Sequence, residues 1–144
     1  FDNASPAVDK GGGSVTLTGK SNTTKITFSK GVGDVIGADI SAIKFTANGA
    51  SATNGIAITG DPGAKAKYTF SVTLTAAANE TIEARTQQII AIAAGGQKAT
   101  ATLNQTAGDP FIEVTPIEID VPQDGSAVQV TVNTNTAFTV TPKS

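Results

Sequence analysis

The sequence predicts an all-β protein: an antiparallel β-sandwich followed by the opening strands of a second, similar sandwich. Apolar and polar residues alternate along most of the chain, which is the period of a strand with one buried face. Turn-forming Gly, Asn and Pro residues interrupt these runs at short intervals, as in sandwiches made of many short strands. Only 15% of the residues are charged and Thr is abundant, a composition that favours strands over helices.

The expected strands follow from the alternating runs. The clearest run is KYTFSVTLT at 67–75, where apolar positions alternate with Thr and Ser. Residues 90–103 contain two further alternating segments, one led by Ile90 and Ile92, on either side of Gly95-Gly96. Shorter apolar pairs indicate the remaining strands: Val15 with Leu17, Ile26 with Phe28, Ile43 with Phe45, and Ile56 with Ile58.

Glycine pairs mark the expected turns. Gly95-Gly96 between two alternating segments predicts a hairpin with a type I′ turn, which needs a positive φ at both central residues. Asn48-Gly49 and the GDPG stretch at 60–63 indicate further turns. The one candidate helix is 34–43, and its β-branched residues and internal Gly predict that it is short.

An internal repeat divides the chain. FDNASPAVDKGGGSVTL at the start aligns with FIEVTPIEIDVPQDGSAVQV, so that Phe1 meets Phe111 and, after a two-residue gap, Gly13 meets Gly125. The spacing is that of one sandwich domain. We therefore expect a complete domain at 1–109 and the first strands of an incomplete second copy at 110–144.

The two ends of the first copy and all of the second resemble the BACON domain family. The closing stretch AANETIEARTQQIIAIAAGGQKATATLNQTAG carries the family's Asn, Arg, alternating hairpin and terminal Gln. The stretch 31–67 matches no family motif, and no Trp stands near Phe138, where the family usually has one. The matching positions are Asn79, Arg85, Ile90, Ile92 and Gln105, then Pro116, Gly125-Ser126, Val128, Val130, Val132, Asn135 and Phe138.

The resemblance implies an immunoglobulin-like (Ig-like) sandwich, as found in surface proteins of gut Bacteroidetes and in their phages. It therefore implies an extracellular or cell-surface location, with the virion as the alternative. The family's association with glycan-degrading proteins is compatible with contact to surface or mucin glycans and equally with a spacer or adhesion role.

Composition argues against several other functions. The net charge is −2 and there is a single Arg, so the concentrated positive face of a nucleic-acid-binding protein is missing. No apolar run approaches the roughly 20 residues of a membrane-spanning helix. Without His or Cys, the common general base and the best nucleophile are absent. The carboxylate pairs Glu80 with Glu83 and Glu118 with Asp120 are best read as solvated, and we expect no enzyme, no cofactor and no metal site.

Three aromatic residues are candidates for glycan or inter-domain contact. Phe1 and Phe111 fall near domain joints, whereas Tyr68 alternates in phase with core residues and is also a candidate core residue. Glycan sites usually present an exposed aromatic ring, and aromatics make up only 5% of this chain.

The segment 110–144 carries three apolar strand faces and is too short to bury them, because chains below about 40 residues rarely fold unaided. Three hypotheses follow: it is part of a longer tandem protein, it folds back on the first copy, or it completes a neighbouring subunit by strand addition. The last would make the protein a structural subunit of a phage virion (decoration, fibre or tail) or of a surface filament. The partners are then neighbouring Ig-like domains or subunits. The candidate assembly residues are Ile117, Ile119, Val121, Val128, Val130, Val132 and Phe138.

Overall fold

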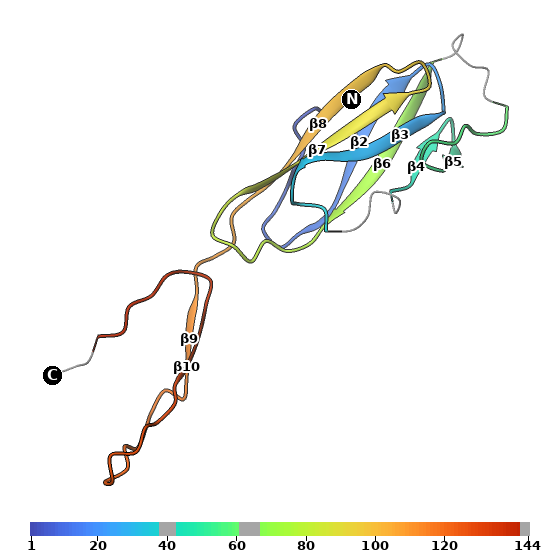
Figure 1. Ribbon diagram of the computed structural model, residues 1–144. Helices are drawn as coiled ribbons and strands as arrows, with labels where there is room; N and C mark the ends of the chain where they lie inside the picture. Colours follow the sequence, from blue (N-terminus) through green and yellow to red (C-terminus); the bar gives the residue numbers. More distant parts are fainter. Residues whose placement is uncertain (38–42, 61–66, 142–144) are drawn as a thin grey trace.

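Two packed four-stranded sheets and a separate two-stranded hairpin make up the molecule (Figure 1). The computed structural model describes residues 1–37, 43–60 and 67–141. All regular elements in these ranges are strands, which confirms the all-β, sandwich-like prediction. The candidate helix has no helical turn in its described part, and the rest of it lies outside the described residues. In the described ranges we find no helix long and apolar enough to cross a membrane.

The first sheet has the strand order β1-β8-β7-β3. Its central pair, β7 and β8, is antiparallel from Arg85 opposite Gln105 to Ile92 opposite Lys98. β1 joins β8 in parallel, and β3 pairs antiparallel with β7. The bounds are β1 (Ala7–Val8), β3 (Ile26–Gly33), β7 (Arg85–Ala93) and β8 (Lys98–Gln105).

The second sheet has the order β2-β6-β4-β5. β2 pairs with β6 along its whole length, from Gly13 opposite Ala76 to Ser21 opposite Tyr68. In β6, buried apolar residues alternate with exposed or half-buried Thr and Ser, as the KYTFSVTLT run predicts. The bounds are β2 (Gly13–Ser21), β4 (Phe45–Ala47), β5 (Ala50–Ala52) and β6 (Tyr68–Ala76).

Apolar side chains of both sheets fill the space between them. The ring of Phe28 lies 5.3 Å from that of Phe45 and 5.7 Å from that of Phe70, both in edge-to-face geometry, which aromatic pairs prefer. The buried face of β7 is formed by Ile89 and Ala91, not by the alternate residues Ile90 and Ile92, which are half-buried. Further fully buried side chains are Leu17, Val72, Leu74, Ala101 and Leu103.

The two glycine-containing hairpins differ from each other. Asn48 and Gly49 both have positive φ, 50° and 78°, so the turn expected there joins β4 to β5 with type I′ geometry. Of Gly95 and Gly96 only Gly96 has a positive φ, 83°. The type I′ prediction for this turn is therefore wrong: β7 ends at Ala93 and β8 begins at Lys98, which leaves a longer loop.

The prediction of a strand around Ile56 and Ile58 is also wrong, because these residues lie in no strand. These residues follow the open edge of β3, where Asn54 takes the place of a partner strand. The Asn54 side chain accepts a hydrogen bond from the Phe28 amide (2.6 Å) and donates one to the Phe28 carbonyl (2.9 Å). A single side chain thus satisfies backbone groups that a further strand would otherwise pair.

The hairpin of β9 (Ile112–Thr115) and β10 (Thr131–Thr134) repeats the opening of the first sandwich. The Asp2 amide donates to the Thr18 carbonyl (2.8 Å), which places Phe1 opposite Gly19. In the hairpin, Val114 lies opposite Val132. Val114 is 113 positions after Phe1, and Val132 is 113 positions after Gly19, so the two pairs correspond with a single offset.

Two turns follow the same offset. The amides of Gly12 and Gly125 each donate to the carbonyl three residues earlier, with φ of 77° and 75°. The side chains of Ser21 and Thr134 each accept a hydrogen bond from the amide two residues later. The repeat therefore needs no gap, and the sequence alignment of Phe1 with Phe111 is corrected: Val114 is the counterpart of Phe1.

Candidate functional site at the joint

A buried asparagine organises the end of the sandwich nearest the hairpin. Asn79, in the loop between β6 and β7, is only 4% exposed. Its Nδ2 donates to the carbonyls of Glu83 (2.7 Å) and Thr106 (3.0 Å). Its Oδ1 accepts from the amide and the hydroxyl of Thr81. The loop is thereby fixed to the segment that leaves β8 for the hairpin.

A second polar pair closes the same end of the first sheet. Arg85 begins β7 and donates to Oε1 of Gln105 at the end of β8 (2.7 Å) and to the Ala78 carbonyl (3.1 Å). Gln105 is 2% exposed, and its Nε2 donates to the carbonyls of Asp9 and Ala77. Arg85 and Gln105 thus hold each other and the loop after β6, and Asn79 holds the same loop to the segment after β8. All three of these side chains have structural partners at this end of the sandwich.

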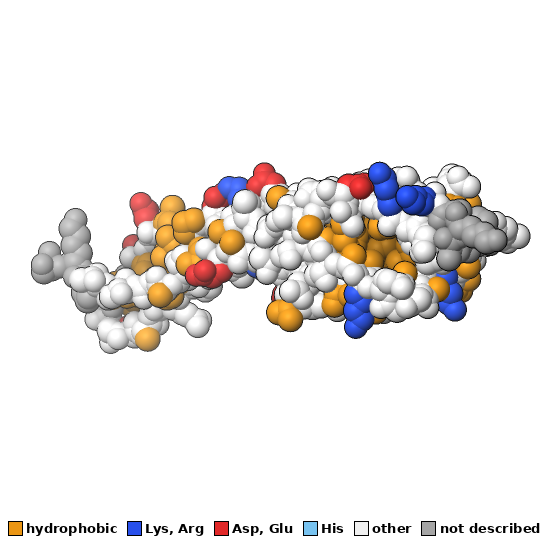
Figure 2. All heavy atoms as spheres, turned by 90° about the horizontal axis from the view of Figure 1, so that it is seen from above, with side chains coloured by type: hydrophobic (Ala, Val, Ile, Leu, Met, Phe, Trp, Pro, Cys, Tyr) orange, Lys and Arg blue, Asp and Glu red, His pale blue; other side chains and the backbone are white. Residues whose placement is uncertain are grey.

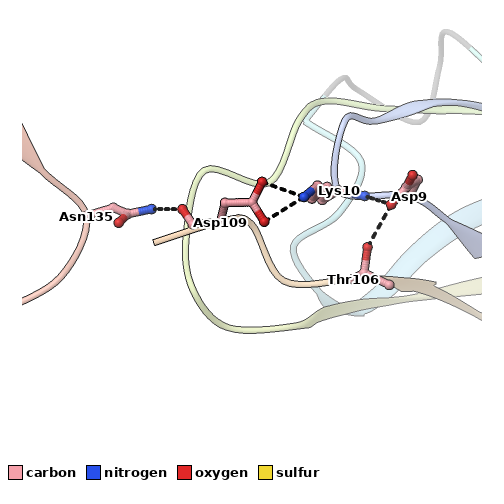
Figure 3. A network of polar contacts seen from close by, with 5 residues as sticks. All are labelled: Asp9, Lys10, Thr106, Asp109 and Asn135. Atoms are coloured by element: carbon pink, nitrogen blue, oxygen red, sulfur yellow. Dashed lines mark hydrogen bonds and ion pairs between the residues drawn. The ribbon is translucent and has the colours of Figure 1, made fainter. Parts of the chain in front are cut away.

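The chain leaves the sandwich through Asp109, which is held by an ion pair (Figure 3). Lys10 Nζ donates to both carboxylate oxygens of Asp109, at 2.6 Å to Oδ1. This hydrogen bond, supported by the negative charges of Asp109 and Asp9, raises the pKa of Lys10 above its ordinary value. Both side chains are exposed, so the pair orients the linker more than it stabilises the fold.

Asn135 connects the hairpin back to the sandwich across this linker. Its Nδ2 donates to the backbone carbonyls of Glu80 (2.8 Å) and Asp109 (2.9 Å). Its Oδ1 accepts from the amide of Phe111 (3.1 Å). The Thr134 hydroxyl donates to the Phe111 carbonyl (2.7 Å). The Asn135 side chain thereby contacts the loop between β6 and β7, the linker and the start of the hairpin segment.

The three aromatic candidates have different surroundings. Tyr68 is only 6% exposed and presents no open ring. Phe1 is half-buried: it packs against Phe70, with ring centroids 5.9 Å apart, and lines a surface hollow with Lys20 and Asn22. Phe111 lies at the joint and is 41% exposed. It shares a shallow hollow with Phe138, which is 48% exposed. Sequence reasoning identified Phe111 but gave Phe138 only an assembly role.

Apolar side chains gather on the surface of the hairpin segment, at the left of Figure 2. Of the seven assembly candidates only Val132 lies in a strand, because 116–130 and 135–141 form none. Figure 1 shows the hairpin extending away from the sandwich, not folded back over it. The side chains left exposed at about 40% or more include Ile112, Val114, Ile117, Ile119, Val121, Val128, Phe138 and Val140.

The carboxylates do not converge. Within 1–37, 43–60 and 67–141, no group of three or more Asp or Glu side chains is placed to hold a metal ion. Glu80 and Glu83 are exposed and serve the joint through their backbone carbonyls. Sequence reasoning missed Lys10 and Asp109, because residues 99 positions apart give no local signal of their contact.

Comparison of the sequence with models of known protein families and with curated proteins finds no match in either.

Proposed function

We propose that this chain is a non-catalytic extracellular module, a tandem of Ig-like sandwiches that acts as a spacer or adhesion domain of a cell-surface or virion protein. The observation that carries the proposal is the joint. Asn135 and the Lys10–Asp109 pair fix the start of the second copy against the end of the first. A spacer needs such a defined orientation between successive domains.

Strand order supports the Ig-like assignment. In immunoglobulin domains one sheet contains the strands B, E and D as neighbours, and the other contains G, F and C. Here β2, β6 and β4 occupy the first set of places in chain order, and β8, β7 and β3 the second. The short β1 beside β8 extends the second set.

Double electron–electron resonance between two spin labels tests the spacer role. The chain has no Cys, so spin labels attach only to the cysteines that are introduced. Labels at Thr73→Cys in β6 and Glu113→Cys in β9, both exposed positions, should give one narrow distance distribution. Asn135→Ala should broaden it. Asn22→Ala, at the equivalent position of the first copy, is the matched control and should not. A broad distribution in the parent chain would refute a fixed spacer.

The exposed hairpin favours a second candidate, a virion or filament subunit that assembles by strand sharing. Ile119 and Val121 are counterparts of Pro6 and Val8, which lie against β8 in the first copy, yet both are exposed. The second copy therefore presents the surfaces that β6 and β8 cover in the first. Such surfaces are completed by strands of the same chain or of a neighbour.

Light scattering over a range of concentrations tests assembly between chains. Strand sharing predicts a mass that rises with concentration. Val132→Lys places a charge on the apolar face of β10 and should abolish the rise, whereas Asn133→Lys, on the opposite face, should leave it intact. A constant monomer mass in the parent chain would argue against sharing between chains and leave the spacer proposal standing.

A further inference from the structure

One contact in the first sandwich depends on a glycine. Gly19 of β2 lies opposite Phe70 of β6 and beside Phe1, whose ring packs edge-on against that of Phe70. A Cβ at position 19 would collide with Phe70 Cζ and lie 2.9 Å from its Cε1. The absence of a side chain in β2 is what admits the aromatic ring of the neighbouring strand.

The second copy changes both residues that surround this ring. By the common register, Val132 stands where Gly19 stands, and Val114 stands where Phe1 stands. Val132 therefore adds a branched side chain at the position that must be empty for an aromatic ring, while the smaller Val114 frees room beside it. Apolar volume is thus moved from the position of Phe1 to that of Gly19. As a result, an aromatic ring on a strand paired with β10, at the place that Phe70 takes beside β2, would have no room.

From this we infer that the free edge of β10 accepts an antiparallel strand with the alternation of β6 but with an aliphatic residue, not an aromatic one, opposite Val132. The inference rests on the proposal that 110–144 opens a second sandwich. It commits the site to one occupant: a strand chemically distinct from β6 of this chain. The seating of β6 on β2 shows the direction and register of that occupant.

The same steric difference prevents an unwanted pairing. Within the described residues β10 pairs only with β9, so two such segments would each present an open β10 edge beside a β6 strand that carries Phe70. If β6 fitted β10, the sandwich of one chain would open to pair with the hairpin of another. Val132 would clash with Phe70 if β6 of another chain paired with β10, and this clash opposes the pairing. Specificity is often gained through such a clash with an unwanted partner.

Strand length agrees with an acceptor that lacks its partner. β2 is nine residues long, and every one of them is paired with β6. β10 is only four residues long, and the preceding residues 126–130 form no strand. Val128 and Val130, at the places of Val15 and Leu17, should join a longer β10 once a partner strand is bound.

Fluorescence polarisation with labelled synthetic peptides on the full chain tests the inference. The parent peptide has the sequence of 68–76, and its variant carries Phe70→Val. The variant should bind at least about ten-fold more tightly, because overpacking of one ring into a closed site costs on this scale. A third peptide with Val72→Lys, which charges the inward face, should not bind.

Two variants of the chain complete the test. Val132→Gly with Val114→Phe restores the arrangement of the first copy and should reverse the preference in favour of the parent peptide. Asn133→Gly, a neighbouring position on the outer face, should leave the preference unchanged and controls for loss of structure. Equal or tighter binding of the parent peptide to the original chain, or no binding of any peptide, would overturn the inference. Neither result would alter the label distances that test the spacer.

Discussion

Replacement of Asn79 by Ala tests how the joint end of the sandwich is held. The side chain makes four hydrogen bonds, two from Nδ2 and two to Oδ1, and it is buried. A net contribution of about 1 kcal/mol for each bond, reduced because the loop can partly rehydrate, gives an expected loss of about 2–4 kcal/mol in the free energy of unfolding.

Urea unfolding followed by far-UV circular dichroism measures this loss, since the chain has no Trp to report by fluorescence. With a typical urea dependence, the midpoint of Asn79→Ala should fall by about 1 M or more. Asn22→Ala removes an amide of the same size that makes no hydrogen bond in the described residues, and should change stability by no more than about 0.5 kcal/mol. Equal midpoint shifts in the two variants would refute the reasoning.

Replacement of Asn79 by Asp should make the free energy of unfolding depend on pH. The new carboxylate would face the carbonyl oxygens of Glu83 and Thr106, so its protonated form, which can still donate, is favoured in the folded protein. Its pKa is then higher when folded than when unfolded, and stability relative to the parent should recover as the pH falls. A penalty that is constant with pH would show that donation to these carbonyls is unimportant.

The remaining predictions concern the linker, the core and the ion pair. Gly108→Ala should broaden the label distance distribution across the joint, because its Cβ would collide with the Asn79 carbonyl; an unchanged distribution would contradict this. Gly19→Val should destabilise the sandwich by about 1–3 kcal/mol through overpacking against Phe70, and in urea unfolding Phe70→Leu should cost less in that background than in the parent. The pKa of Lys10 is raised above its ordinary value of 10.5, so the Lys10–Asp109 ion pair is fully formed below pH 10.5 and is lost as the pH rises through the pKa in the folded protein. The label distance distribution across the joint should therefore broaden only above pH 10.5. Lys10→Ala should abolish this pH dependence.

Alternation predicted the strands well where a run was long. The KYTFSVTLT run became β6 in the centre of its sheet, because each alternate side chain meets the core. Among the short apolar pairs, Val15 with Leu17 and Ile26 with Phe28 also lie in strands, whereas Ile56 with Ile58 does not. Ile56 and Ile58 follow the edge of β3 without pairing, since the Asn54 side chain already occupies the backbone groups of Phe28. No local pattern indicates such a contact between residues 26 positions apart.

The turns show the same division. Asn48-Gly49 adopts the geometry that its residues favour, because both can take a positive φ at little cost. Gly95-Gly96 could do so too, but the register of β7 on β8 leaves a longer loop in which only Gly96 needs it. The residues permit a turn type, and strand pairing selects it.

By itself, the sequence determined the all-β class and the turns at Asn48-Gly49 and Gly95-Gly96, and it indicated an internal repeat, because period, composition and Gly placement are local properties of the chain. The turn expected in the GDPG stretch lies mostly outside the described residues. Tertiary structure alone decided the register of that repeat, the contact of Lys10 with Asp109 and the role of Asn135. These depend on backbone positions brought together from distant parts of the chain. The exchange of Phe1 and Gly19 for Val114 and Val132 became visible only when strand pairing placed them opposite one another.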